Sequence, residues 1–257
     1  MVEIQDRQVV IQGTTIAVEH ITAGGADRPP LVFLHEALGS IRMWKDFPVR
    51  LCQRCGLNGI VFDRQGHGRS DPMSSARTFD YLDRETGEKL PAVLDALGIE
   101  KASFFGHSDG GTMALLFAAR FPERVHSCVT EAAHVFVEDE TRAGIQRAVK
   151  AYATTDLKAR LEKYHGDKTD ALFWAWADIW LSEEFVSWNI EEDIKGVECP
   201  LLVVQGEDDE YATREQVDRI AKNVSGRVET VLIPGCGHVP HLQSLDRTVS
   251  IAARFLC

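Results

Sequence analysis

Residues 102–116 read Ala-Ser-Phe-Phe-Gly-His-Ser-Asp-Gly-Gly-Thr-Met-Ala-Leu-Leu, with a serine between two glycines. An apolar, strand-like run at 102–106 leads into this motif, and a helix-like pattern at 110–120 follows it at once. In Gly-x-Ser-x-Gly the glycines remove side chains from a turn too tight for them, so the serine is held strained and exposed. The five letters recur by chance, but a strand before them and a helix after them is the confirming context. The stretch therefore predicts a strand–turn–helix unit with Ser108 as a candidate nucleophile.

A serine hydroxyl needs a neighbouring base to take its proton, and that base needs an acid to orient it. Later in the chain, the apolar run 201–205 ends in a glycine followed by the acidic stretch 207–210. A second apolar run, 228–234, is followed by Gly-Cys-Gly-His-Val-Pro, which places His238 in a loop near a strand end. The order serine, acid, histidine is the one this kind of fold uses.

The spacing of these motifs resembles the α/β-hydrolase superfamily over nearly the whole chain. The similarity also rests on Leu34-His35 and on Asp-Arg-Gln-Gly-His-Gly-Arg-Ser at 63–70, each after an expected strand. The resemblance implies a catalytic triad of Ser108, Asp209 and His238.

Two other acidic residues remain candidates for the acid of the triad. In the family the acid usually stands three residues after the glycine that ends the seventh strand, which selects Asp209, and Asp208 is its nearest rival. Glu131 is a third candidate, because some relatives carry the acid after the sixth strand.

The resemblance also implies an oxyanion hole made of the backbone amides of Ala37 and Asp109. The Asp109 amide belongs to the first turn of the expected helix, whose N–H groups lack intrahelical partners. Relatives commonly have glycine after the histidine of this loop, whereas this chain has Glu36 after His35. A carboxylate would repel a developing oxyanion, so Glu36 is expected to point away.

Two interpretations of the acidic pair Glu36 and Asp109 are open. The pair forms a rim that binds a cationic group of the substrate, such as the amine of an amino-acid ester. In the other interpretation, both carboxylates are solvated or hydrogen-bonded to loop amides.

Four other histidines need an interpretation beside His238. His35 and His67 resemble family positions that shape the loops beside the active site, and we interpret them as structural. The roles of His134 and His241 stay open.

Composition and charge narrow the function classes. The chain has 257 residues, 44% of them hydrophobic and 26% charged, which fits a large α/β domain with a generous core. Its formal net charge of −11 disfavours nucleic acid and anionic membranes as partners, since both bind clustered Lys and Arg. The start has no basic stretch followed by an apolar core, and no apolar run approaches the roughly 20 residues that span a bilayer. A cytoplasmic protein acting on a small molecule is expected, and a homodimer stays open.

The six cysteines stand at 52, 55, 128, 199, 236 and 257, without the spacing of a small disulfide framework. Reduced thiols are therefore the expectation. Cys52 and Cys55 have redox spacing but lie in an expected helix, and no second pair completes a zinc site. Neither a metal nor an organic cofactor is implied.

Continuous apolar runs predict strands of a mostly parallel sheet covered by helices on both faces. The expected strands are 14–21, 30–34, 59–63, 102–106, 125–130, 201–205 and 228–234. The expected helices are 43–54, 79–97 (broken at Gly87 and Pro91), 110–120, 214–223 and 241–256. The fold class is thus α/β, specifically the α/β-hydrolase fold.

Between residues 133 and 194 the alternation of strand-like and helix-like runs stops, and a helical segment rich in aromatic residues replaces it. This segment resembles the family's cap, inserted between the sixth and seventh strands, and residues 1–132 and 195–257 then form the core. Trp176 and Trp180 stand four apart and share a helix face. They are expected either to line an apolar substrate pocket or to hold the cap onto the core.

The expected reaction is transfer of an acyl group to water through an acyl-enzyme on Ser108, with a small carboxylic ester, lactone or thioester as substrate. Fold alone does not separate this from carbon–carbon bond hydrolysis, cofactor-free haloperoxidase or perhydrolase chemistry, or a lyase. A non-enzyme alternative is a small-molecule receptor on the same scaffold.

Overall fold

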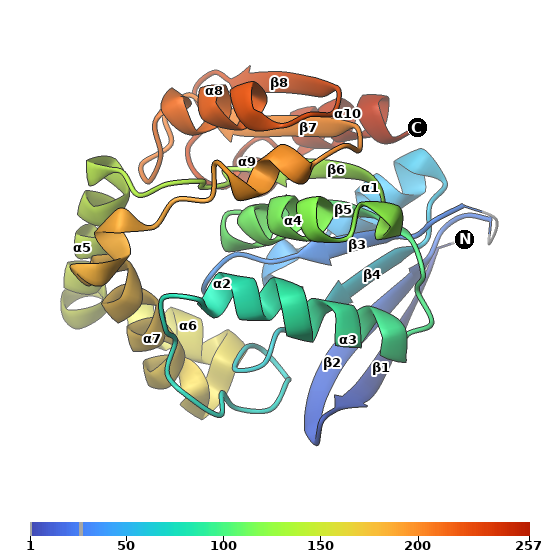
Figure 1. Ribbon diagram of the computed structural model, residues 1–257. Coiled ribbons are helices and arrows are strands. Elements are labelled where there is room, and N and C mark those ends of the chain that lie inside the picture. The colour runs from blue at the N-terminus through green and yellow to red at the C-terminus, as the bar shows by residue number, and fades with distance from the viewer. Residues whose placement is uncertain (1, 26–27) are drawn as a thin grey trace.

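An eight-stranded sheet lies at the centre of the protein (Figure 1). The computed structural model describes residues 2–25 and 28–257. The strand order is β1-β2-β4-β3-β5-β6-β7-β8; β1 and β2 pair antiparallel, β2 pairs antiparallel with β4, and the other neighbours are parallel. The strands are β1 Glu3–Ile11, β2 Thr14–Thr22, β3 Leu31–Leu34, β4 Gly59–Phe62, β5 Ala102–His107, β6 Val125–Glu131, β7 Leu201–Gly206 and β8 Val228–Ile233.

The helices cover both faces of this sheet, as the continuous apolar strands require. Along β3, Val32 and Leu34 pack into one core cluster, and Leu31 and Phe33 pack into the other. The first cluster lies under α3 (Leu90–Ala96), α4 (Asp109–Arg120) and α8 (Arg214–Asn223), and the second under α1 (Phe47–Cys55) and α10 (Leu245–Leu256). The two-sided α/β-hydrolase fold expected from the sequence is confirmed.

The sequence analysis missed one strand and misread one helix. β1 was missed because nearly all of its side chains are exposed, so no apolar face marks it. Gly87 and Pro91 do not break the helix after residue 79. Instead α2 (Tyr81–Arg84) continues through a π-helical turn, Glu85–Lys89, into α3 (Figure 1). Leu90 donates its N–H to the Glu85 carbonyl, and this wider turn accommodates a proline that has no N–H to donate.

Helices replace the strand–helix alternation between β6 and β7. They are α5 (Asp139–Thr154), α6 (Leu157–His165) and α7 (Thr169–Leu181), followed by short 3-10 turns at Glu184–Ser187 and Asp193–Gly196. The helices pack on one another at one side of the molecule (Figure 1). They lie within the segment 133–194, and the division into a core and a cap stays a prediction.

Cys55 and Cys257 form a disulfide bond, so the expectation of reduced thiols is wrong for this pair. The two residues are 202 positions apart but meet because α1 and α10 pack against each other. Cys52, Cys128, Cys199 and Cys236 are free and buried. Sequence spacing could not reveal this bond because it depends on the packing of two distant helices.

No helix within residues 2–25 and 28–257 is both long enough and apolar enough to cross a lipid bilayer.

Candidate active site

Ser108 lies on the turn between β5 and α4, with backbone φ +53° and ψ −118°. A non-glycine residue reaches positive φ only at a cost, so the surrounding structure must hold it there. The glycines on either side of Ser108 allow the chain to form this tight turn. A Cβ atom on Gly106 would overlap the Gly110 carbonyl, and one on Gly110 would overlap the Leu34 carbonyl.

The structure brings the three residues of the expected triad together. The Nε2 atom of His238 lies 3.0 Å from Ser108 Oγ, and its Nδ1 atom lies 2.8 Å and 3.0 Å from the two carboxylate oxygens of Asp209. Asp209 follows β7 and also accepts the N–H of Tyr211 at 2.9 Å, which orients the carboxylate. The rival Asp208 has no side-chain hydrogen bond to His238 within the described part of the chain.

Burial and charge shift the pKa values of His238 and Asp209 in opposite directions. Burial lowers the pKa of His238, but attraction to Asp209 and the hydrogen bond with it outweigh burial and raise the pKa above 6.5. Burial raises the pKa of Asp209, yet the His238 contacts and the Tyr211 N–H bring it below 3.8. The acid is therefore ionised at neutral pH, and the imidazole next to Ser108 is a stronger base than an isolated one.

The backbone amides of Ala37 and Asp109 are the expected donors of the oxyanion hole. Neither N–H is used in a hydrogen bond among the described residues, and both residues line the cavity that contains Ser108. The peptide plane of the Ala37 amide is fixed through the Glu36 carbonyl oxygen. That oxygen accepts three hydrogen bonds, from Arg64 Nη2 at 2.9 Å, His35 Nδ1 at 2.8 Å and the Gly39 amide at 3.0 Å.

Glu36, the unusual residue of this loop, lines the same cavity. Its Oε2 atom folds back to accept the Leu38 N–H at 2.6 Å. Burial raises the pKa of the Glu36 carboxyl above 4.5, more than the Leu38 hydrogen bond and the nearby His238 lower it.

Asp109 has partners that the sequence analysis did not identify. Its carboxylate accepts the Tyr81 hydroxyl at 3.1 Å and forms ion pairs with Arg64 at 3.7 Å and Arg77 at 3.8 Å. Arg64 lies in the Asp-Arg-Gln-Gly motif, so a positive charge near the turn that carries Ser108 was open to inference. Nothing in the sequence around Arg77 indicates its position.

The cavity above Ser108 has a volume of about 290 Å³. Trp176 and Trp180 of α7 both line it, together with Ile145 and Leu161 from the neighbouring helices. Trp180 also donates its Nε1–H to the Tyr81 hydroxyl at 2.9 Å, so it both lines the cavity and ties α7 to the core.

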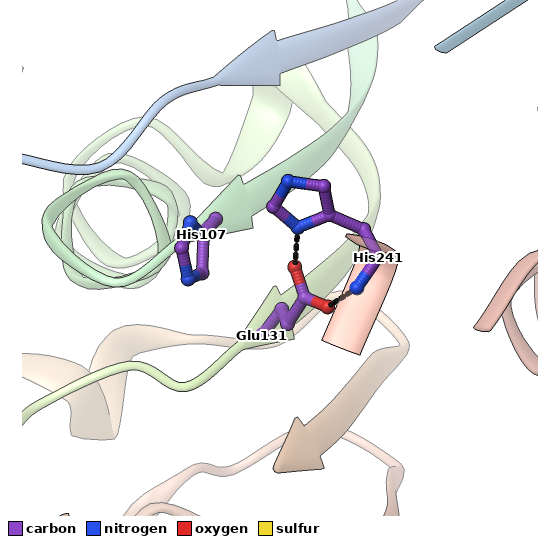
Figure 2. Close-up of side chains that lie close together, drawn as sticks. All are labelled: His107, Glu131 and His241. Atoms are coloured by element: carbon purple, nitrogen blue, oxygen red, sulfur yellow. Dashed lines mark hydrogen bonds and ion pairs between the residues drawn. The ribbon is translucent and has the colours of Figure 1, made fainter. Parts of the chain in front are cut away.

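Glu131, the third candidate acid, contacts His241 (Figure 2). One carboxylate oxygen accepts the His241 backbone N–H and the other lies against its Nδ1, both at 2.6 Å. His107 completes this buried group, and ligand atoms of the three residues lie within 4.8 Å of one another. That spacing could hold a metal ion, but both Glu131 oxygens are already taken by His241, so we describe the group as a hydrogen-bonded clamp. His134 lines the cavity with Nε2 3.3 Å from the Tyr211 carbonyl.

Comparisons with known proteins identify the family of the chain. Residues 29–159 match the family model described as the alpha/beta hydrolase fold. The chain is 31% identical over 202 residues to serine hydrolase BPHL of Homo sapiens, covering 77% of this chain and 68% of that protein. It is 32% identical over 163 residues to 3-oxoadipate enol-lactonase 1 of Acinetobacter baylyi, covering 62% and 57%.

Among solved structures, the 2-hydroxy-6-oxo-6-phenylhexa-2,4-dienoate hydrolase of Rhodococcus sp. strain RHA1 superposes with a TM-score of 0.83. It covers 99% of both chains at 16% identity, and this likeness concerns the fold alone. The family-model match and the similarity to the human protein carry the assignment: the chain belongs to the α/β-hydrolase family.

Proposed function

We propose that the protein is a serine hydrolase that cleaves a small carboxylic ester, lactone or thioester through an acyl-enzyme on Ser108. The observation that carries the proposal is the position of His238, whose two ring nitrogens lie within hydrogen-bond distance of Ser108 and Asp209. A nucleophile, a base and an orienting acid in this arrangement are the requirements for acyl transfer.

In the proposed mechanism, Ser108 Oγ attacks the carbonyl carbon while His238 Nε2 takes the hydroxyl proton. Asp209 holds the Nδ1 proton and stabilises the imidazolium that forms. The amides of Ala37 and Asp109 bind the negative oxygen, and loss of one such donor typically costs about 3 kcal/mol of transition-state stabilisation. His238 then gives its proton to the leaving group, and water activated by the same ring releases the acid.

An active-site fluorophosphonate tests the proposal. We expect stoichiometric attachment to Ser108 that is lost in Ser108→Ala and kept in Ser187→Ala, because Ser187 is exposed on the turn after α7. A folded protein that takes up no label would instead favour a small-molecule receptor. A panel of p-nitrophenyl esters, lactones, thioesters and a vinylogous diketone would then separate ester cleavage from carbon–carbon bond cleavage.

A cationic substrate group is favoured by a second observation. The cavity lining includes three carboxylates, those of Glu36, Asp109 and Glu210, and neither lysine nor arginine among the described residues. Arg64 and Arg77 already balance Asp109, and Glu210 is exposed and accepts the His238 backbone N–H at 3.1 Å. Glu36 is therefore the half-buried carboxylate left to attract an amine.

An α-amino ester compared with its desamino analogue tests this point. We expect about a tenfold higher kcat/KM for the amino ester, a size that one partly screened charge pair supplies. Glu36→Gln should reduce that ratio toward one. Equal turnover of both esters by the unmodified protein would remove the amine from the proposal and leave the ester chemistry intact.

A further inference from the structure

Four polar side chains line the same cavity as Ser108 and are not used by the proposed mechanism: Ser40, Trp44, His107 and His241. The rings of the last three lie next to one another, with centroids 4.5 to 6.3 Å apart, and Ser40 directly precedes the short 3-10 helix that ends at Trp44. We call this part of the lining the polar end of the cavity. Ser40 and Trp44 are only 1% and 2% exposed, and within the described residues neither the Ser40 hydroxyl nor the Trp44 Nε1–H has a hydrogen-bond partner. Burying such groups without a partner is costly, so two of them beside one cavity point to a ligand group.

His107 offers a hydrogen-bond acceptor at this end. Its Nε2 atom lies 2.8 Å from the backbone carbonyl oxygen of His238, which can only accept, so Nε2 carries the proton. Burial keeps the pKa of His107 well below 6.5, and the ring is neutral. Its Nδ1 atom therefore has a free lone pair, and no hydrogen bond of the described residues uses it.

His241 is oriented in a comparable way. Glu131 holds both the backbone N–H and the Nδ1 side of this residue, and Figure 2 shows the second ring nitrogen on the edge of the ring away from the carboxylate. The ring centroid lies 4.5 Å from that of Trp44 and 4.9 Å from that of His107. No hydrogen bond among the described residues uses the Nε2 atom of this ring.

This end of the cavity thus combines a donor, the Trp44 Nε1–H, with an acceptor, the Nδ1 atom of His107, and with the Ser40 hydroxyl, which can donate or accept. A carboxylate would meet the lone pair of His107, and an ammonium group would meet the indole N–H. A hydroxyl group satisfies both kinds of partner, because it donates one hydrogen bond and accepts up to two.

The geometry points to a hydroxyl-binding subsite formed by Ser40, Trp44, His107 and His241, which selects substrates that carry an alcohol group away from the scissile bond. Glu131 is a positioning residue for this subsite, since it acts through His241. The inference rests on the proposed hydrolase function and adds a substrate class to it.

The test uses the full-length protein and two pairs of uncharged esters. In one pair the acyl chain ends in a hydroxyl or in a methyl group, and in the other the alcohol part carries that difference. We expect one pair to show about a 10- to 100-fold higher kcat/KM for the hydroxyl ester, the effect of leaving buried polar groups unpaired with the methyl analogue. The pair that responds shows on which side of the scissile bond the subsite lies.

Two small substitutions tie that preference to the subsite. Trp44→Phe removes the indole N–H and keeps an aromatic ring, and Ser40→Ala removes a hydroxyl that makes no helix-cap hydrogen bond. Each should lower the hydroxyl/methyl ratio at least threefold, and the double variant should bring it near one. Trp174→Phe is the matched control, because Trp174 is 41% exposed and outside the cavity lining, and its ratio should equal the wild-type value.

The ratio does not depend on the folded fraction, so a less stable variant still gives a valid result. Wild-type protein that hydrolyses both members of each pair equally would overturn the subsite and leave the hydrolase proposal standing. A hydroxyl preference that survives in the Trp44→Phe, Ser40→Ala double variant would also overturn it. Absence of turnover with all four esters, together with no fluorophosphonate labelling, would mean that the proposed function itself is wrong.

Discussion

Asp109 and Arg64 form an ion pair at 3.7 Å beneath the cavity, and each side chain is only 2% exposed. Arg77 approaches the same carboxylate at 3.8 Å. Asp109→Asn would leave two buried guanidinium groups without a carboxylate, so we expect a loss of about 3 kcal/mol in the free energy of unfolding. Urea denaturation measures it. Asp6→Asn is the control: Asp6 pairs with Arg69 at the surface, where the expected loss is below about 1 kcal/mol. Equal stabilities of the two variants would contradict the role of Asp109.

Asp209→Asn should lower kcat by about 10⁴-fold, because an amide favours the wrong tautomer of His238. Glu131 is not expected to take over, since both of its oxygens are engaged by His241. Asp208→Asn is the matched control and should retain kcat within a factor of about two, given that of these two carboxylates it is Asp209 that hydrogen-bonds the imidazole. Steady-state kinetics on one ester checks all of these. A larger loss in Asp208→Asn than in Asp209→Asn would assign the acid to the neighbouring residue.

The pH profile follows from the raised pKa of His238. The base must be neutral, so kcat/KM should fall as the pH drops through that pKa, with a midpoint above 6.5. In Asp209→Asn the midpoint of the residual activity should lie lower than in the wild type, because the attraction and the hydrogen bond of Asp209, which raise the pKa of His238, are lost while burial still lowers it. The pKa of Asp209 is itself lowered below 3.8, so its protonation does not contribute to the profile near neutral pH. A midpoint that does not move on this substitution would show that another group titrates.

The triad was open to prediction because its signals are local. A strained turn requires glycines at fixed positions, and a loop after a strand end is marked by glycine and proline, so Ser108 and His238 stand out in the sequence. The choice of Asp209 over Asp208 came from the family resemblance, and the structure adds the reason: only one of these adjacent carboxylates faces the imidazole.

The partners of Asp109 and the polar end of the cavity were not predictable in this way. Arg77, Tyr81 and Trp44 reach the site through tertiary packing, and no sequence period or motif marks them. The same holds for the Cys55–Cys257 bond, because its geometry depends on how α1 and α10 meet. β1 was missed for the opposite reason, since an exposed edge strand has no buried face to produce a pattern.

The disulfide should stabilise the protein because it closes a long loop of chain. Its two cysteines are 202 residues apart, and the loop-entropy model, which grows with the logarithm of loop length, assigns about 5 kcal/mol to a closure of this size. Reduction should therefore lower the free energy of unfolding by a few kcal/mol in the wild type and have no effect in Cys257→Ser. Mass spectrometry of the oxidised protein should find these two cysteines linked and the other four free. A wild type as stable reduced as oxidised would argue against the bond.

Gly110→Ala should damage catalysis more than it damages the fold. A Cβ atom at this position would overlap the Leu34 carbonyl, so the start of α4 must move away from β3. That movement displaces Ser108 and the Asp109 amide together. A misplacement of about 1 Å costs roughly 100-fold in rate, whereas crowding in the core costs about 1–3 kcal/mol. Single-turnover acylation and urea denaturation measure the two effects.

Gly25→Ala is the matched control, since a Cβ there has no atom within 4 Å, and both its rate and its stability should equal the wild-type values. A Gly110→Ala variant that acylates at the wild-type rate would mean that the turn carrying Ser108 tolerates a side chain and that its geometry does not position the nucleophile.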